Sequence, residues 1–118
     1  MVKENVIADK SYNFALSIVK TYLFLSNEKH EFVLSKQLLR SGTAIGALVS
    51  ESRFAQSKAD FIHKLHIAVK EANETMYWIS LLRDSDFITT SMYDSLFPDI
   101  DEIICILSAI IKTSKSRS

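Results

Sequence analysis

The segment Ala59–Arg83 constrains the fold most, because it carries one long helical pattern without Gly or Pro. At about 100° per residue, apolar side chains three and four positions apart fall on a single stripe. This stripe comprises Phe61, Leu65, Ala68, Ala72, Met76 and Ile79. A second, mixed face lies on the far side and comprises Ile67, Glu71, Glu74, Trp78 and Leu81. We expect the first face to be core and the second to be covered by something outside a simple bundle.

Three further segments, 7–26, 31–54 and 91–111, show the same helical spacing of apolar residues. Ser57 with Asp60 predicts a capping box before the central helix, and Ser91 with Asp94 predicts one before the last helix. The connections between the four segments are short, so consecutive helices should be antiparallel neighbours. The sequence therefore predicts an all-α, antiparallel up-down-up-down four-helix bundle.

The last helix contains Pro98, which removes a backbone hydrogen bond and predicts a kink or a restart near that residue. We expect the bundle domain to span residues 1–111. Residues 112–118, KTSKSRS, are polar and basic, and we expect them to form a disordered tail.

Two glycines, Gly42 and Gly46, fall inside the second helical segment, where glycine weakens a helix. Together with Ser41 they are small enough to let another helix approach closely. Close helix packing is therefore the expected reason for both glycines.

The composition indicates one soluble helical domain, since 47% of the 118 residues are hydrophobic and only two are Gly and one is Pro. Lys plus Arg equals Asp plus Glu, 14 against 14, so no global field attracts nucleic acid or an anionic membrane. A single cysteine, Cys105, excludes an internal disulfide and fits a reducing compartment. No apolar run is long enough to span a bilayer and the N-terminus lacks a signal core, so we expect a cytoplasmic protein without a membrane partner.

Enzymatic and metal chemistry find little support. A di-iron bundle needs Glu-x-x-His on two helices, whereas this chain has Glu71-x-x-Glu74 on one. His63 and His66 are three residues apart, but nothing specifies further zinc ligands. Cys105 lies in an apolar helix without a flanking basic group, so we do not expect it to act as a nucleophile. We expect no catalytic residue, no metal and no cofactor.

Two segments carry a resemblance to a known family. QLLRSGTAIGALVSES, residues 37–52, resembles the signature Q-L-x-R-A-x-x-S-I-x-x-N-I-A-E-G of the bacterial four-helix-bundle proteins encoded in 23S rRNA intervening sequences, with Leu48 in place of Asn and Ser52 in place of Gly. IAVKEANETMYWISLL, residues 67–82, resembles the family's second signature, I-A-x-x-E-x-x-E-x-x-Y-W-L-x-L-L. The second match is the more specific.

The resemblance implies an antiparallel four-helix bundle that assembles into a homopentameric ring without established catalysis. A related branch includes accessory proteins of diversity-generating retroelements, whose rings bind a reverse transcriptase and nucleic acid. By position, Arg40 corresponds to the family's basic residue and Glu51, Glu71 and Glu74 to its acidic ones, and a mutual ion-pair network is their most economical role. Arg40 and Glu51 lie about 16 Å apart along one helix, so each must pair with another helix or subunit.

A ring also has a physical argument, because the mixed face of Ala59–Arg83 leaves apolar surface that a closed oligomer would hide. Phe24 projects among polar residues and is a further contact candidate, unless it is simply a lone exposed aromatic. Trp78 could instead fill an edge of its own bundle. The residues predicted at the oligomer interface are Phe24, Ile67, Glu71, Glu74, Tyr77, Trp78 and Leu81.

Two functions of different classes follow. The first is a ring-shaped, nucleic-acid-associated accessory protein that binds RNA or DNA, although zero net charge argues against it. Its candidate contacts are Lys36, Arg40, Arg53, Lys58 and Lys64, with Lys112, Lys115 and Arg117 of the tail. The alternative is a protein-interaction scaffold with no nucleic-acid ligand, whose ring presents a surface to a partner such as a polymerase.

Overall fold

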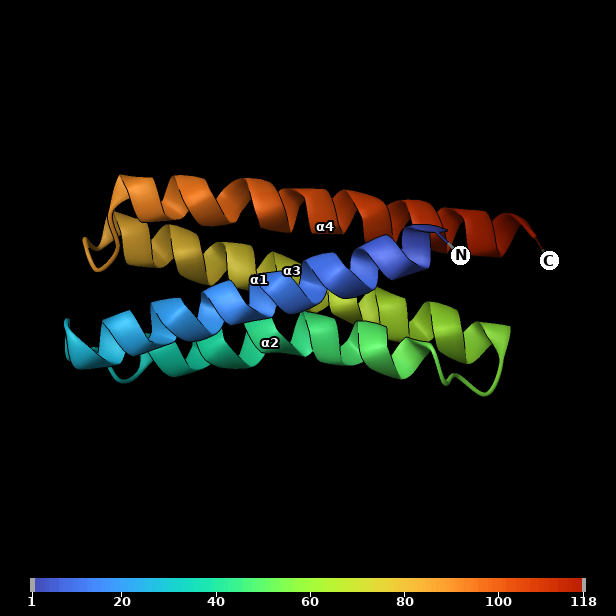
Figure 1. Ribbon diagram of the computed structural model, residues 1–118, viewed down its shortest axis with the longest axis horizontal. Coiled ribbons are helices and arrows are strands. Elements are labelled where there is room, and N and C mark those ends of the chain that lie inside the picture. The colour runs from blue at the N-terminus through green and yellow to red at the C-terminus, as the bar shows by residue number, and fades with distance from the viewer. Residues whose placement is uncertain (1, 118) are drawn as a thin grey trace.

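The computed structural model describes residues 2–117, with side chains described from Val6 onward. These residues form four helices and no strand: α1 (Val2–Asn27), α2 (Leu34–Ser52), α3 (Lys58–Asp84) and α4 (Thr90–Ser116). The helices run alternately up and down along a bundle 48 Å long (Figure 1). Each packs against the next in the chain, and α1 also packs against α4. The predicted all-α four-helix bundle is confirmed.

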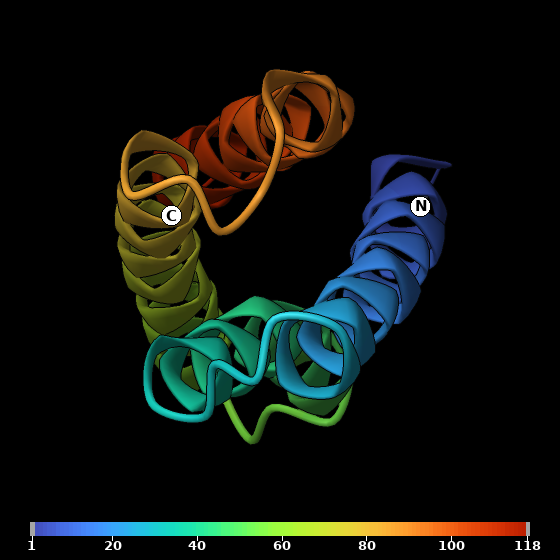
Figure 2. The same ribbon diagram turned by 90° about the vertical axis from the view of Figure 1, so that its left-hand side faces the viewer.

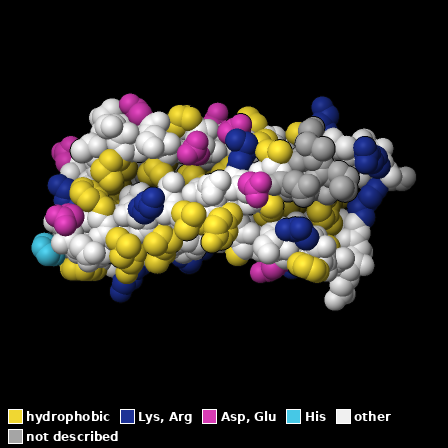
Figure 3. Space-filling model, viewed as in Figure 1, with side chains coloured by type: hydrophobic (Ala, Val, Ile, Leu, Met, Phe, Trp, Pro, Cys, Tyr) yellow, Lys and Arg dark blue, Asp and Glu magenta, His cyan; other side chains and the backbone are white. Residues whose placement is uncertain are grey.

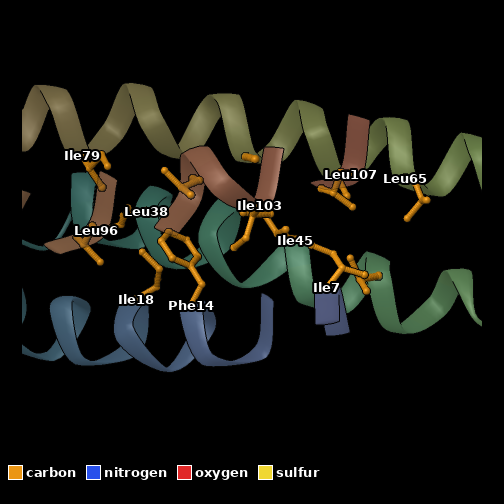
Figure 4. Packing of buried hydrophobic residues seen from close by; sticks show 14 of the residues in the cluster. Ile7, Phe14, Ile18, Leu38, Ile45, Leu65, Ile79, Leu96, Ile103 and Leu107 are labelled. Atoms are coloured by element: carbon orange, nitrogen blue, oxygen red, sulfur yellow. The ribbon is translucent and has the colours of Figure 1, made fainter. Parts of the chain in front are cut away.

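The core lies between all four helices (Figure 4). On α3 the predicted stripe faces this core, since Leu65, Ala68, Ala72 and Ile79 are buried. The actual buried seam of α3 also includes Thr75, which the sequence analysis did not place there. The labelled members of the core are Ile7, Phe14, Ile18, Leu38, Ile45, Leu65, Ile79, Leu96, Ile103 and Leu107.

The predicted N-cap at Ser57 is confirmed, and the predicted N-cap at Ser91 is wrong. The second bond of the predicted capping box at Ser57 differs from expectation, because the carboxylate of Asp60 accepts from the N–H of Gln56 at 3.2 Å and not from that of Ser57. The hydroxyl of Ser57 accepts a hydrogen bond of 3.0 Å from the backbone N–H of Asp60, as expected at the start of α3. At α4 the cap is Thr89, whose hydroxyl accepts from the N–H of Met92 at 3.1 Å. Ser91 is the second residue of the helix, so its hydroxyl lies two positions too late to cap it.

The second helix begins at Leu34, three residues later than residue 31, because a side chain replaces the first turn of backbone bonding. The carboxylate of Glu31 accepts hydrogen bonds from the N–H groups of Val33, Leu34 and Ser35 at 3.2, 2.9 and 2.7 Å. Burial raises the pKa of Glu31, but these hydrogen bonds outweigh burial and leave that pKa below its ordinary value. Glu31 therefore caps α2 as a charged group.

Glu31→Ala is expected to lower the free energy of unfolding by about 1 kcal/mol at pH 7, because three N–H groups lose their acceptor. A depressed folded-state pKa contributes stability above the unfolded pKa, and this contribution disappears as the pH falls through the folded pKa. Urea unfolding at pH 7 and at pH 3 should show the difference from the native chain shrinking in acid. Glu28→Ala, which removes an exposed carboxylate that makes no such bonds, is the control. A difference that does not vary with pH would contradict the capping role.

The helix α4 differs from its prediction in two ways. It is one unbroken helix through Pro98, so there is no restart. Pro98 and Asp94 are exposed, and water can reach the carbonyl that loses its N–H partner. The helix also continues to Ser116 where a disordered tail was predicted from residue 112. Lysines in the last turns interact favourably with the negative end of the helix dipole, which helps this polar stretch stay helical. Residue 118 lies outside the described residues.

The two glycines of α2 permit close packing, as predicted, and the helix that approaches is α1. A Cβ at Gly42 would lie 2.7 Å from Cγ1 and 2.9 Å from Cγ2 of Ile18. A Cβ at Gly46 would lie 3.2 Å from the carbonyl oxygen of Ser11. Both positions therefore lie under α1 and leave little or no room for a side chain.

Candidate functional site

The residues of the two signature segments meet where α2 crosses the outer face of α3. The guanidinium of Arg40 on α2 binds Glu71 Oε1 at 3.1 Å through Nη1 and binds Glu74 Oε2 through Nη2. The indole Nε1 of Trp78 donates to the same oxygen of Glu74 at 3.1 Å. Part of the mixed face that the sequence left without a partner is thus covered by Arg40 of the same chain.

The charged groups of this cluster compensate one another. Hydrogen bonds from Arg40, and then from Trp78, hold the pKa of Glu74 below its ordinary value. The guanidinium of Arg40 is always charged, and the lowered pKa keeps Glu74 ionised. Neither of these two groups therefore exchanges a proton near neutral pH. The side chain of Arg40 is 50% exposed, which makes the pairs modest contributors to stability. The arrangement can fix α2 against α3, and it is poorly suited to acid–base catalysis.

A buried polar contact lies beneath the cluster. The hydroxyl oxygens of Ser41 and Thr75 are 2.9 Å apart, and both side chains are inaccessible to water. Thr75 Oγ1 is also 2.8 Å from the carbonyl oxygen of Glu71. The sequence analysis missed Thr75, although its place in the three-four seam between Ala72 and Ile79 could have indicated it.

The predicted ion-pair network is confirmed for three of its four residues. Arg40 joins Glu71 and Glu74, whereas Glu51 lies 3.7 Å from Nζ of Lys64 on α3. Lys64 also lies 4.0 Å from Asp60, one turn earlier. Arg40 and Glu51 each pair with another helix of the same chain, as their separation required.

A family model described as 23S rRNA-intervening sequence protein matches residues 3–109, which include the whole Arg40, Glu71 and Glu74 cluster. The chain belongs to this family. A similar solved structure is that of a protein of unknown function from the S23 ribosomal protein family of Bacteroides thetaiotaomicron. It has 56% sequence identity and a TM-score of 0.92, over 93% of this chain and 98% of that one. No curated protein matches.

The chain carries two seams on α1 with helical spacing. The inner seam is buried and comprises Ile7, Ser11, Phe14, Ile18, Thr21 and Leu25. The outer seam, which we call the α1 stripe, comprises Tyr12, Leu16, Val19 and Leu23, with 65%, 46%, 38% and 47% exposure. Both follow steps of four and three, the spacing of helix-to-helix packing. Figure 3 shows apolar side chains along this face of the molecule.

A groove of about 480 Å³ lies beside the α1 stripe, between α1 and α2. Tyr12 and Ala15 of α1 and Gly46 and Ala47 of α2 line it. Small residues on both sides leave room for side chains from another surface. The α1 stripe was not among the interface residues predicted from the sequence.

The predicted apolar interface residues on α3 differ in their exposure. Tyr77 is 61% and Leu81 36% exposed, whereas Ile67 and Trp78 are half-buried. The Trp78 ring packs against the core and meets Tyr77 edge-to-face, with centroids 5.1 Å apart. We call Tyr77, Trp78 and Leu81 the α3 patch.

Phe24 is not a lone exposed aromatic. It is half-buried against the core, with Nζ of Lys29 5.9 Å from its ring centroid.

The five predicted nucleic-acid contacts do not form one patch. Arg40 and Lys64 are held in the ion pairs described above. Lys36, near the start of α2, is separated from Arg53, just beyond its end, by about 25 Å of helix. Arg53 and Lys58 flank the α2–α3 connection, at the end of the bundle where the C-terminus also lies (Figure 1). The geometry gathers basic residues only at that end.

Within residues 2–117, no helix is long and apolar enough to cross a membrane. The same part of the chain holds no group of three or more His, Cys, Asp or Glu side chains placed to bind a metal ion.

Proposed function

We propose that this protein is a non-enzymatic scaffold that assembles with copies of itself through the α1 stripe and the α3 patch. The observation that carries the proposal is the second seam of α1. Its four members have the spacing that packs one helix against another, yet no helix of the same chain covers them. Contiguous apolar surface of this kind on a small domain marks an interaction site.

The position of the two surfaces favours a ring over a two-fold dimer. Helices α1 and α3 do not pack against each other in the described chain, and they lie at opposite corners of the bundle (Figure 2). Two different surfaces facing different directions support head-to-tail contact, which closes into a ring when the rotation allows. Five subunits is the number that the family resemblance implies.

The Arg40 cluster fits the polar rim of such an interface. Arg40, Glu71 and Glu74 lie beside the α3 patch and satisfy one another within the chain. Their charges therefore need no partner from the next subunit. The apolar residues of the α3 patch can be buried at an interface without leaving one of these charges unpaired.

Light scattering and native mass spectrometry test this proposal directly. We expect a single assembly whose mass is a fixed multiple of 13.4 kDa over a wide range of protein concentration. A monomer at all concentrations would contradict the proposal.

Nucleic-acid binding is the second candidate. It is favoured by the basic end of the bundle, where Arg53 and Lys58 form no ion pair among the described residues. A ring would repeat this end in every subunit. Two observations argue against nucleic-acid binding. The net charge of the chain is zero, and Arg40 and Lys64 are paired with carboxylates. A protein partner, such as a polymerase, is the alternative occupant of the assembled surface.

A salt series with structured RNA and duplex DNA separates these candidates. If phosphates are bound, replacing Lys36, Arg53 and Lys58 by Ala should weaken binding and flatten the dependence of log affinity on log salt by about one unit of slope per contact. Lys20→Ala, which removes an exposed cation of α1, is the control. Equal affinity of the triple variant and the native protein would exclude these residues as the contact.

A further inference from the structure

A second cavity lies at the end of the bundle where α2 turns into α3. Its volume is about 560 Å³, within the range of small-molecule sites. Each helix contributes one buried apolar residue to its lining: Ile7, Val49, Leu65 and Ile110, which are 2%, 3%, 2% and 5% exposed. The half-buried ring of Phe61 adds a further apolar wall. The wall that these five residues form is therefore apolar.

The two serine hydroxyls that line the cavity already have hydrogen-bond partners. The hydroxyl of Ser52 donates to the carbonyl of Val49 at 2.7 Å, and the hydroxyl of Ser57 accepts from the N–H of Asp60. Neither needs a polar partner from a ligand. The part of a ligand that enters the cavity should accordingly be apolar.

The exposed rim of the cavity is cationic. Arg53 and Lys58 both line it, and neither forms an ion pair among the described residues. The acidic groups nearest in the sequence, Glu51 and Asp60, pair with another cation, since they lie 3.7 and 4.0 Å from Nζ of Lys64. Two positive charges thus remain beside an apolar cavity.

We propose that this cavity binds a small amphipathic anion, with an apolar chain on the hydrocarbon lining and a carboxylate or phosphate head group between Arg53 and Lys58. A neutral apolar molecule would leave both cations without a partner, and a simple inorganic anion would leave the lining empty. This inference does not depend on the proposed assembly, since every lining residue belongs to one chain.

Calorimetric titration of the full-length protein with four probes tests the proposal, each kept below its micelle concentration. Decanoate or decyl phosphate should bind with one site per chain, and their relative affinities distinguish the two head groups. Decyltrimethylammonium, with the same tail and the opposite charge, and inorganic phosphate alone should not bind. The proposal would be overturned if neither decanoate nor decyl phosphate binds. It would also be overturned if decyltrimethylammonium binds as tightly as the anionic amphiphiles.

Substitutions locate the site. Arg53→Gln and Lys58→Gln should each weaken decanoate or decyl phosphate binding by roughly fivefold, as expected for partly exposed charge pairs. Lys36→Gln removes the same charge at the far end of α2 and should leave the affinity unchanged. Methyl NMR should show ligand-induced shifts at Ile7 and Leu65. Shifts confined to Leu16 and Leu23 would instead show adsorption on the α1 stripe and contradict the cavity as the site.

Discussion

Replacing Leu16 and Leu23 together by Glu is expected to convert the assembly into monomers that keep their full helical content. Both side chains are nearly half exposed in the isolated chain, so the substitutions should hardly affect folding. At an interface between copies the same positions would bury two charges without partners, which costs several kcal/mol in each contact. Light scattering measures the mass, and circular dichroism measures the helix content.

A matched control uses the same helix and the same spacing. Asn13→Glu with Lys20→Glu places two carboxylates seven residues apart on exposed positions outside the α1 stripe, and it should leave the assembly intact. An unchanged mass for the Leu16 and Leu23 variant would exclude the α1 stripe as an interface.

Mixing two monomeric variants distinguishes a head-to-tail contact from a two-fold one. Tyr77→Glu with Leu81→Glu should also give monomers, because it disrupts the α3 patch. Each variant keeps one intact surface, so an equimolar mixture should form a heterodimer that cannot grow. A mixture that stays monomeric would contradict the pairing of the α1 stripe with the α3 patch.

Gly42→Ala is expected to lower the free energy of unfolding by about 1–3 kcal/mol, even though Ala favours helix by about 1 kcal/mol over Gly. The added Cβ would lie 2.7 Å from Cγ1 of Ile18. That side chain is completely buried and β-branched, so it cannot turn aside without strain. Urea or thermal unfolding measures the change.

A double-mutant cycle isolates the cause. Ile18→Ala removes both γ-carbons that the new Cβ would meet, and in that background Gly42→Ala should become neutral or stabilising by up to about 1 kcal/mol. Gly46→Ala, with its nearest contact at 3.2 Å, should cost less than Gly42→Ala in the native background. The same loss in both backgrounds would show that Ile18 is not the obstacle.

Much of the fold followed from local patterns. Three-four spacing of apolar residues placed four helices, and Ser57 with Asp60 marked the start of α3, because a cap depends on residues a few positions apart. The pairing of Arg40 with Glu71 and Glu74 could be anticipated from the resemblance and from the impossibility of an Arg40–Glu51 pair along one helix.

Other features could not be predicted from the pattern of residues along one helix. The cap at Thr89 displaced the predicted one at Ser91, and Glu31 reached forward to three N–H groups from outside the helix. Phe24 and Trp78 were expected at an outer surface, yet both pack against the core of their own chain. Their burial depends on the side chains that α2 and α4 bring beside them, which periodicity along one helix does not reveal.

The sequence by itself determined that α1 is a helix with apolar side chains at three- and four-residue spacing, because helical periodicity is a local property of the chain. Only the tertiary structure decided which seam is core. That choice depends on how α1 is rotated against α2 and α4, and the close approach of Ile18 to Gly42 fixes this rotation. Phe14, Ile18 and Leu25 therefore turn inward, and Tyr12, Leu16, Val19 and Leu23 remain at the surface.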